Sequence, residues 1–219
     1  RRSSDLTAAL RSASNSAEFR RLARAETGVE IEVVSGQREA ELTFAAVSAE
    51  RPLAGKLLNI DIGGGSTELS LGRAGLLSKR LSYDLGANRL TEQTGPHADP
   101  PSDEQIGAMR AMAQAMAREA SAEFDSRGVE AVGVGGTITT MAAITLALGS
   151  YDAQAVARHN LTLEQIDALV DRLAALPLAE REQVVGLSPK RAPVIVAGAI
   201  LCAELVRELG LGSLGVSAG

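Results

Sequence analysis

Apolar residues recur along this chain in two patterns, one typical of strands and the other typical of helices. Residues 57–62 form a nearly continuous apolar run, as in a strand buried on both faces, and residues 67–71 alternate as a strand with one polar face does. A similar strand is expected at residues 76–81. Together these segments predict a three-stranded antiparallel meander over residues 56–82.

Apolar residues spaced three or four apart predict the helices. Asn15 and Glu18 suggest a capping box for the first helix, which Gly28 would end. Ser35-Gly36 would end the next strand, just before the second helix. Residues 94–102 form an expected surface loop. The expected helices lie at residues 15–28, 38–47, 103–124, 138–148, 162–177 and 193–210, with further strands at 29–34, 129–134 and 214–218.

The composition is that of a globular protein whose core is built from small and aliphatic side chains. With 219 residues the chain can bury one sizeable core or two small lobes. Its net charge of −5 argues against non-specific nucleic-acid binding, and no segment is apolar enough for long enough to span a membrane. Since nothing looks like a signal peptide, a cytoplasmic location is the default expectation. The single Cys202 is expected to be a buried thiol.

A glycine-rich turn between the first two strands of the meander carries the clearest chemistry. The stretch reads Asp61-Ile62-Gly63-Gly64-Gly65-Ser66-Thr67-Glu68. Glycines lack a Cβ atom, so they allow positive φ and bring backbone N–H groups close to an anion, the arrangement that cradles phosphate. Hard carboxylate oxygens beside phosphate, here from Asp61 and Glu68, suit Mg²⁺. The turn therefore predicts a phosphate site flanked by metal ligands.

Other interpretations of this turn fit less well. A P-loop needs Gly-Lys-Ser/Thr at its end, and a dinucleotide-binding fold needs a helix after the glycines; the sequence meets neither condition. The remaining alternative is a hairpin turn without a ligand. Two-residue turns usually suffice for hairpins, however, and turn chemistry does not explain an acid on each side.

Gly135-Gly136-Thr137 forms a second such turn, between the strand at 129–134 and the helix at 138–148. The N-terminal amides of that helix would point at whatever occupies the turn, because the positive end of the helix dipole lies there. We therefore expect a second anion cradle. The alternative is that the glycines only allow the strand to pack closely against the helix.

Three motifs in this order, Ser35-Gly36-x-x-Glu39-Ala40, the octet at residues 61–68 and Gly135-Gly136-Thr137, resemble the exopolyphosphatase / guanosine pentaphosphate phosphohydrolase (Ppx/GppA) family. Residues 10–13 resemble its arginine-bearing segment, and residues 186–191 a late family motif. The family belongs to the actin-like, sugar-kinase-like ATPase superfold, which is ribonuclease H-like. The resemblance implies an α/β lobe with a mixed sheet that contains an antiparallel meander and is flanked by helices.

The resemblance also implies a division into lobes. Residues 1–36 would be the C-terminal remnant of a first actin-like lobe, and residues 37–219 a second lobe that carries the phosphate-binding loops. Family members begin with an earlier loop of the form Asp-x-Gly-Ser-Asn-Ser, and nothing like it occurs in these 219 residues. The expectation is therefore that the chain supplies one wall of a cleft and hydrolyses little by itself.

The implied reaction is hydrolysis of the terminal phosphoanhydride of inorganic polyphosphate or guanosine pentaphosphate. Glu39, which lies 61 − 39 = 22 residues before Asp61, would be the general base, and Asp61 and Glu68 would hold Mg²⁺ or another divalent cation. A homodimer is a further expected assembly. The implied phosphate ligands are Arg11, Gly63, Gly64, Gly65, Ser66, Gly135, Gly136 and Thr137.

Two other functions stay open at this point. An ATP-dependent kinase or chaperone-like ATPase would keep the superfold, and a non-enzymatic polyphosphate or nucleotide sensor would keep the binding loops. The position of Glu39 and the Glu68 end of the octet resemble Ppx/GppA features rather than kinase ones. For single residues the alternatives are a solvated helix acid at Glu39 and an ordinary surface arginine at Arg11.

Overall fold

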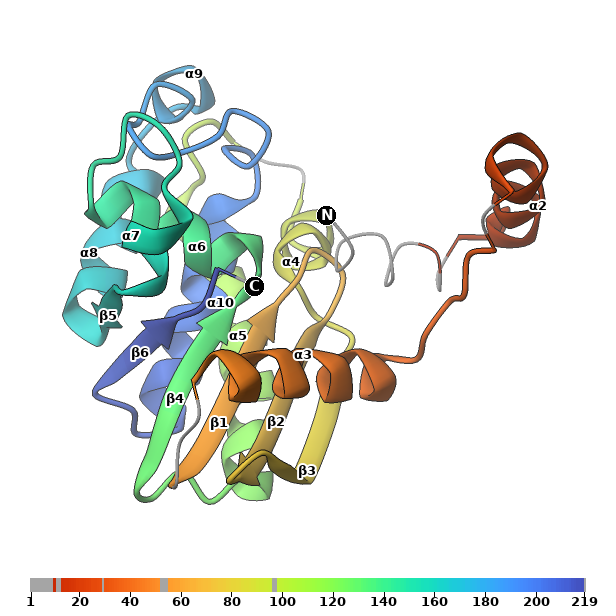
Figure 1. The fold of residues 1–219 in the computed structure, drawn as a ribbon. Helices are drawn as coiled ribbons and strands as arrows, with labels where there is room; N and C mark the ends of the chain where they lie inside the picture. Colours follow the sequence, from red (N-terminus) through yellow and green to blue (C-terminus); the bar gives the residue numbers. More distant parts are fainter. Residues whose placement is uncertain (1–9, 11–12, 29, 52–54, 96–97, 219) are drawn as a thin grey trace.

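The computed structural model describes residues 10, 13–28, 30–51, 55–95 and 98–218, and most of them form one sheet with helices on both faces (Figure 1). The sheet order is β3-β2-β1-β4-β6-β5. β1, β2 and β3 form the predicted antiparallel meander, whereas β4 runs parallel to β1 and β6 parallel to β4. The sheet is therefore mixed. Its strands are β1 Lys56–Ile62, β2 Thr67–Arg73, β3 Leu76–Tyr83, β4 Val129–Val134, β5 Asn160–Thr162 and β6 Ser213–Val216.

Helix α3 (Gly36–Glu50) lies across one face of the sheet, in front of the strands in Figure 1. The Ser35 side chain caps it by accepting a hydrogen bond from the Arg38 amide at 3.2 Å. Phe44 and Val47 share one side of the helix and pack in a small core on the sheet. The other members of that core are Leu57, Val132, Val134 and the partly buried Leu77.

The C-terminal end of α3 is fastened by Arg51. Its Nη2 donates to the carbonyl oxygens of Ala157 and Val216, each at 2.8 Å, and its Nη1 lies 3.5 Å from Glu130 Oε1. These contacts join the end of the helix to β4, to β6 and to the short helix α7 (Ala153–Ala157).

The main core fills the opposite face, where helices cover Leu58, Ile60 and Leu69. The central helix is α10, which is buried along nearly its whole length and packs against α5 and α8. Burial raises the pKa of the Cys202 thiol on α10 to about 12, as befits the buried thiol expected from the sequence. The helices of this half are α4 Ala87–Gln93, α5 Asp103–Glu123, α6 Gly135–Thr145, α8 Leu163–Ala174, α9 Leu178–Arg181 and α10 Ile195–Glu208.

Helix α2 (Ser16–Thr27) stands apart from the sheet and its helices (Figure 1). Gly28 ends it in the left-handed conformation, as predicted, but the expected capping box is wrong because Asn15 makes no side-chain cap bond. Phe19 and Leu22 are each 45% exposed. The division at residue 36 between two lobes stays a prediction.

The strand expected at residues 29–34 is also wrong, since residues 30–34 have no regular structure and Val29 lies outside the described residues. A strand needs a neighbour for its backbone hydrogen bonds, and in the part of the chain that the structure describes no strand lies beside this segment. Helices α4, α7 and α9 and strand β5 were not predicted. No helix of the described residues is long and apolar enough to cross a membrane.

Gly72 tests the packing of α3 on the sheet. A Cβ atom at Gly72 would lie 2.3 Å from Phe44 Cζ and 2.4 Å from the Leu76 carbonyl oxygen. We expect Gly72→Ala to lower the free energy of unfolding by ~1–3 kcal/mol, as overpacking does. The matched control is Gly107→Ala, at an exposed position inside α5 with nothing within 4 Å, which should raise stability by about 0.5–1 kcal/mol. Urea denaturation measures both, and a wild-type midpoint for Gly72→Ala would contradict the packing.

Candidate functional site

Asp61 and Glu68 face each other across β1 and β2, at the end where the glycine turn joins the two strands. They are direct partners in the antiparallel register and are 4% and 2% exposed. Ser82 of β3 is the next partner in the same line, and its Oγ donates to Glu68 Oε1 at 2.7 Å. We call Asp61, Glu68 and Ser82 the acid row. Like charges directly opposite each other destabilise a sheet, so the acid row favours an added positive charge.

The N-terminus of α3 covers the acid row. A Cβ atom at Gly36 would lie 2.2 Å from Ser82 Oγ and 3.4 Å from Glu68 Oε1, so only glycine leaves room for the helix here. The positive end of the α3 dipole therefore lies beside the Glu68 carboxylate, which this contact stabilises.

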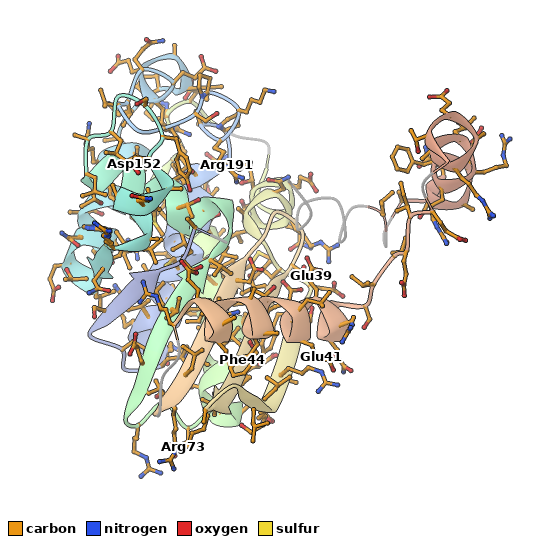
Figure 2. All side chains as sticks on the ribbon, viewed as in Figure 1. Glu39, Glu41, Phe44, Arg73, Asp152 and Arg191 are labelled. Carbon is orange, nitrogen blue, oxygen red and sulfur yellow. The ribbon has the colours of Figure 1, made fainter. Side chains whose placement is uncertain are left out.

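Glu39 lies in the first turn of α3 and is 7% exposed (Figure 2). Thr43, one turn later on the same side, connects this part of the helix with the acid row. Thr43 Oγ1 lies 3.0 Å from the Glu39 carbonyl oxygen and 3.4 Å from Asp61 Oδ2. The sequence interpretation did not single out Thr43, although its spacing of four from Glu39 placed it on the same helix face.

The first glycine turn is held from behind by α4. The carbonyl oxygens of Gly63 and Gly64 accept hydrogen bonds from the first amides of that helix, at 2.9 Å from Ala87 and 2.8 Å from Asn88. The Gly63 amide itself donates to the Ser66 carbonyl at 3.0 Å. The Gly63 amide thus already has a partner within the turn, and the phosphate contacts expected of Gly63, Gly64, Gly65 and Ser66 stay predictions.

Gly135 and Gly136 are not a separate turn, as the sequence suggested, but the first residues of α6. The N-cap Val134 makes no side-chain cap bond to the first amides of α6, which begin the helix beside Asp61. Gly135 has φ +88°, and a Cβ atom there would lie 2.7 Å from Asp61 Oδ1 and 2.8 Å from the Ile62 carbonyl oxygen. The second glycine motif thus lies directly against the acid row.

Thr137 lies in the first turn of α6. Its side chain packs toward α10, where a Cβ atom added at Gly198 would lie 2.8 Å from Thr137 Oγ1. The residue is 3% exposed. Its hydroxyl is therefore turned away from the turn that the glycines open.

Arg191 lies over the beginning of α6, and the sequence interpretation assigned it no role (Figure 2). A Cβ atom at Gly136 would lie 1.8 Å from Arg191 Nη2, so the guanidinium rests directly on the glycine backbone. A cavity of about 370 Å³ extends from there and is lined partly by hydroxyl groups. The sequence did contain a signal for Arg191, because the motif at residues 186–191 ends in this arginine. The cavity's lining includes Thr139, Thr140, Ser150, Tyr151, Ser188 and Arg191.

The structure thus brings together Asp61, Glu68 and the two glycine motifs, with the first turn of α3 beside them. Arg11, the expected arginine ligand, lies outside the described residues. Among the residues that the structure places, no group of three or more His, Cys, Asp or Glu side chains could hold a metal ion. A cation at the acid row would therefore need oxygen ligands from water or phosphate in addition to the two carboxylates.

Comparisons with known proteins agree on one family. The model of the Ppx/GppA phosphatase family matches residues 6–219. Exopolyphosphatase 1 of Mycobacterium tuberculosis is 38% identical over 211 residues, which are 94% of this chain and 60% of that protein. Exopolyphosphatase 2 of the same organism is 33% identical over 190 residues, 86% of this chain and 59% of the relative. The chain thus spans about three fifths of the length of these relatives.

Solved structures agree with the fold class. A structure of the Aquifex aeolicus member of the Ppx/GppA family has a TM-score of 0.84 and 30% sequence identity, and the match covers 96% of this chain and 67% of that one. The α/β fold expected from the sequence, an actin-like lobe with a mixed sheet, is confirmed.

Substitution by alanine should affect stability differently at Gly135 and at Gly136. We expect Gly135→Ala to lower the free energy of unfolding by at least ~1–3 kcal/mol, because the side chain would be strained at positive φ and would meet Asp61. Gly136→Ala should change stability by less than about 0.5 kcal/mol, because the Arg191 guanidinium is the end of a flexible side chain and can move aside. Thermal unfolding of both variants measures the difference, and equal losses would contradict it.

Proposed function

Since the chain belongs to the Ppx/GppA phosphatase family, we propose that the protein hydrolyses the terminal phosphoanhydride bond of inorganic polyphosphate and releases phosphate. The observation that supports the proposal is the close approach of Gly135 to Asp61, because a helix N-terminus, the kind of backbone site that binds anions, then lies beside a pair of carboxylates. The 38% identity with a protein named exopolyphosphatase supports the choice of substrate.

The acid row fits a Mg²⁺ ion. Mg²⁺ usually keeps several waters and is bound by one or two carboxylates together with substrate phosphates, so the two oxygen donors of Asp61 and Glu68 suffice without a third acidic residue. They also face each other on one buried face of the sheet, where a cation would offset their mutual repulsion. When bound, the ion would neutralise negative charge on the phosphate oxygens.

Backbone amides would hold the terminal phosphoryl group from two directions. Those of Gly64, Gly65 and Ser66 would bind it from the first turn, and the first amides of α6 from the second. The Arg191 guanidinium, which lies on Gly136, would add a charge-assisted contact to the same group or to the next phosphate of the chain. Such donors stabilise charge that spreads over the phosphoryl oxygens as the bond breaks.

Glu39 would act as the base. It would accept a proton from the water whose oxygen forms the new bond to phosphorus, while the bridging oxygen leaves with the electron pair of the broken bond. Its place in the first turn of α3, one helical turn from the Thr43 contact to Asp61, supports this role. A base that activates water is expected in a hydrolase. A kinase would instead exclude water from the phosphoryl group.

Guanosine pentaphosphate is a second candidate substrate, favoured by one observation. The cavity of about 370 Å³ beside the start of α6 is lined by Tyr151, which is 60% exposed, and by Arg191. An exposed aromatic ring and a guanidinium are suitable surfaces for stacking a nucleobase. A nucleoside in this cavity would place its phosphates toward the amides of α6.

Glu39→Gln in the full-length protein tests the proposed hydrolysis. The amide keeps the shape of the side chain but cannot take up the proton of water, so we expect phosphate release to fall ~10²- to 10⁴-fold while polyphosphate affinity is kept. The control is Glu164→Gln, which removes the exposed first-turn acid of another helix, α8, and should leave the rate unchanged. A wild-type rate in Glu39→Gln would remove Glu39 from the mechanism.

Tyr151→Ala distinguishes the two substrates. If the cavity holds a nucleoside, the variant should lose about 1–3 kcal/mol of binding to guanosine pentaphosphate, the typical contribution of base stacking, and keep its KM for polyphosphate. Phosphate-release assays with each substrate give both values. Equal KM values for guanosine pentaphosphate in wild type and variant would leave polyphosphate as the proposed substrate.

A further inference from the structure

A second line of polar side chains lies beside the acid row, further from the glycine turn. Asn59 of β1 is the partner of Ser70 of β2, and Ser70 is the partner of Arg80 of β3. We call these three residues the inner row. Each is two positions from a member of the acid row on its own strand, so both rows lie on the α3 face, about 7 Å apart.

Four buried polar atoms of the inner row lack a hydrogen-bond partner among the described residues. Asn59 Nδ2 and Oδ1, Ser70 Oγ and Arg80 Nε are buried and make no hydrogen bond to any described residue. Asn59 and Ser70 are 0% exposed. Leaving such groups dry costs their full desolvation energy, and apolar neighbours on the same face, such as Val132, show that aliphatic side chains fit there. The polar groups therefore need another partner.

Water fits the inner row better than an ion does. Asn59 Nδ2 and Arg80 Nε donate, Asn59 Oδ1 accepts and Ser70 Oγ does both, and a buried water typically makes about three hydrogen bonds with such a set. A cation would meet the positive charge of Arg80. An anion would meet the acid row on one side and Glu41 on the other, since Arg80 Nη2 pairs with Glu41 Oε1 at 2.9 Å.

We propose that the inner row holds ordered water that hydrogen-bonds the carboxylates of the acid row and fixes their orientation for a divalent cation. The inference rests on the proposed function for the presence of that cation. Asn59 and Ser70 are then positioning residues, which act on the cation only through Asp61 and Glu68. Groups that orient metal ligands in this way typically change metal affinity 10- to 100-fold when they are removed.

The test measures Mn²⁺ binding to the protein by electron paramagnetic resonance, because Mn²⁺ replaces Mg²⁺ at oxygen sites and gives a signal without turnover. Asn59→Leu keeps the size of the side chain and removes both polar atoms. We expect it to raise the Kd for Mn²⁺ ~10- to 100-fold while the protein stays folded, since it also removes a desolvation cost. Ser70→Ala should raise the Kd in the same direction.

The matched control is Ile60→Val, at the residue between Asn59 and Asp61. Ile60 belongs to the main core on the opposite face and is 1% exposed. The variant should lower the midpoint of thermal unfolding and leave the Kd for Mn²⁺ unchanged. A purely structural role of Asn59 would give the same pattern for Asn59→Leu, namely an altered midpoint with an unaltered Kd.

Each outcome decides the inference. A folded Asn59→Leu with the wild-type Kd overturns it, and if that variant does not fold, Ser70→Ala decides in the same way. A high-resolution crystal structure with no water bonded to Asn59 or Ser70 also overturns it. If the wild-type protein binds no Mn²⁺, both the cation site of the proposed function and this inference are wrong. If the wild-type protein binds Mn²⁺ and Asn59→Leu binds it equally well, only this inference is wrong.

Discussion

Two carboxylates on neighbouring strands of a buried sheet repel each other, and this repulsion sets the requirements that the surrounding elements meet. Asp61 and Glu68 cannot turn away, because the strand register aims both side chains at the face that α3 covers. The elements packed around them each supply partial positive charge or a donor. These are the α3 N-terminus, the Ser82 hydroxyl, the Thr43 hydroxyl and the first turn of α6.

Glycine makes this convergence possible at specific points. Gly36 lets α3 approach Ser82, and Gly135 lets α6 approach Asp61, in each case within a distance at which a Cβ atom would overlap. The glycines of the first turn act differently, since α4 holds their carbonyl groups. Glycine therefore has two uses here: single glycines allow one element to approach another closely, and the glycines of the first turn form a backbone loop that α4 supports.

The local parts of the fold were predictable from the sequence, and its long-range parts were not. A continuous apolar run and the alternation that follows it predicted the meander of β1 to β3, and apolar periodicity predicted α5, α8 and α10, because these patterns depend on neighbours within a few residues. The alternation of residues 29–34 predicted a strand without showing whether any strand would lie beside it. In the candidate site, the acids and glycines were found from two local motifs. The motifs do not show that α4 lies behind Gly63 or that Arg191 lies on Gly136, because these contacts join segments that are distant in the sequence.

The attachment of α3 at Arg51 has a mechanical consequence. The helix is a stiff rod that is held firmly at one end, by two carbonyl groups of distant segments, and carries Glu39 near the other end, about 18 Å away. A small tilt about the held end is magnified with distance along the rod, so the largest displacement falls at the acid. The position of that carboxylate therefore depends on the region around Arg51, where the end of α3 meets β4, β6 and α7.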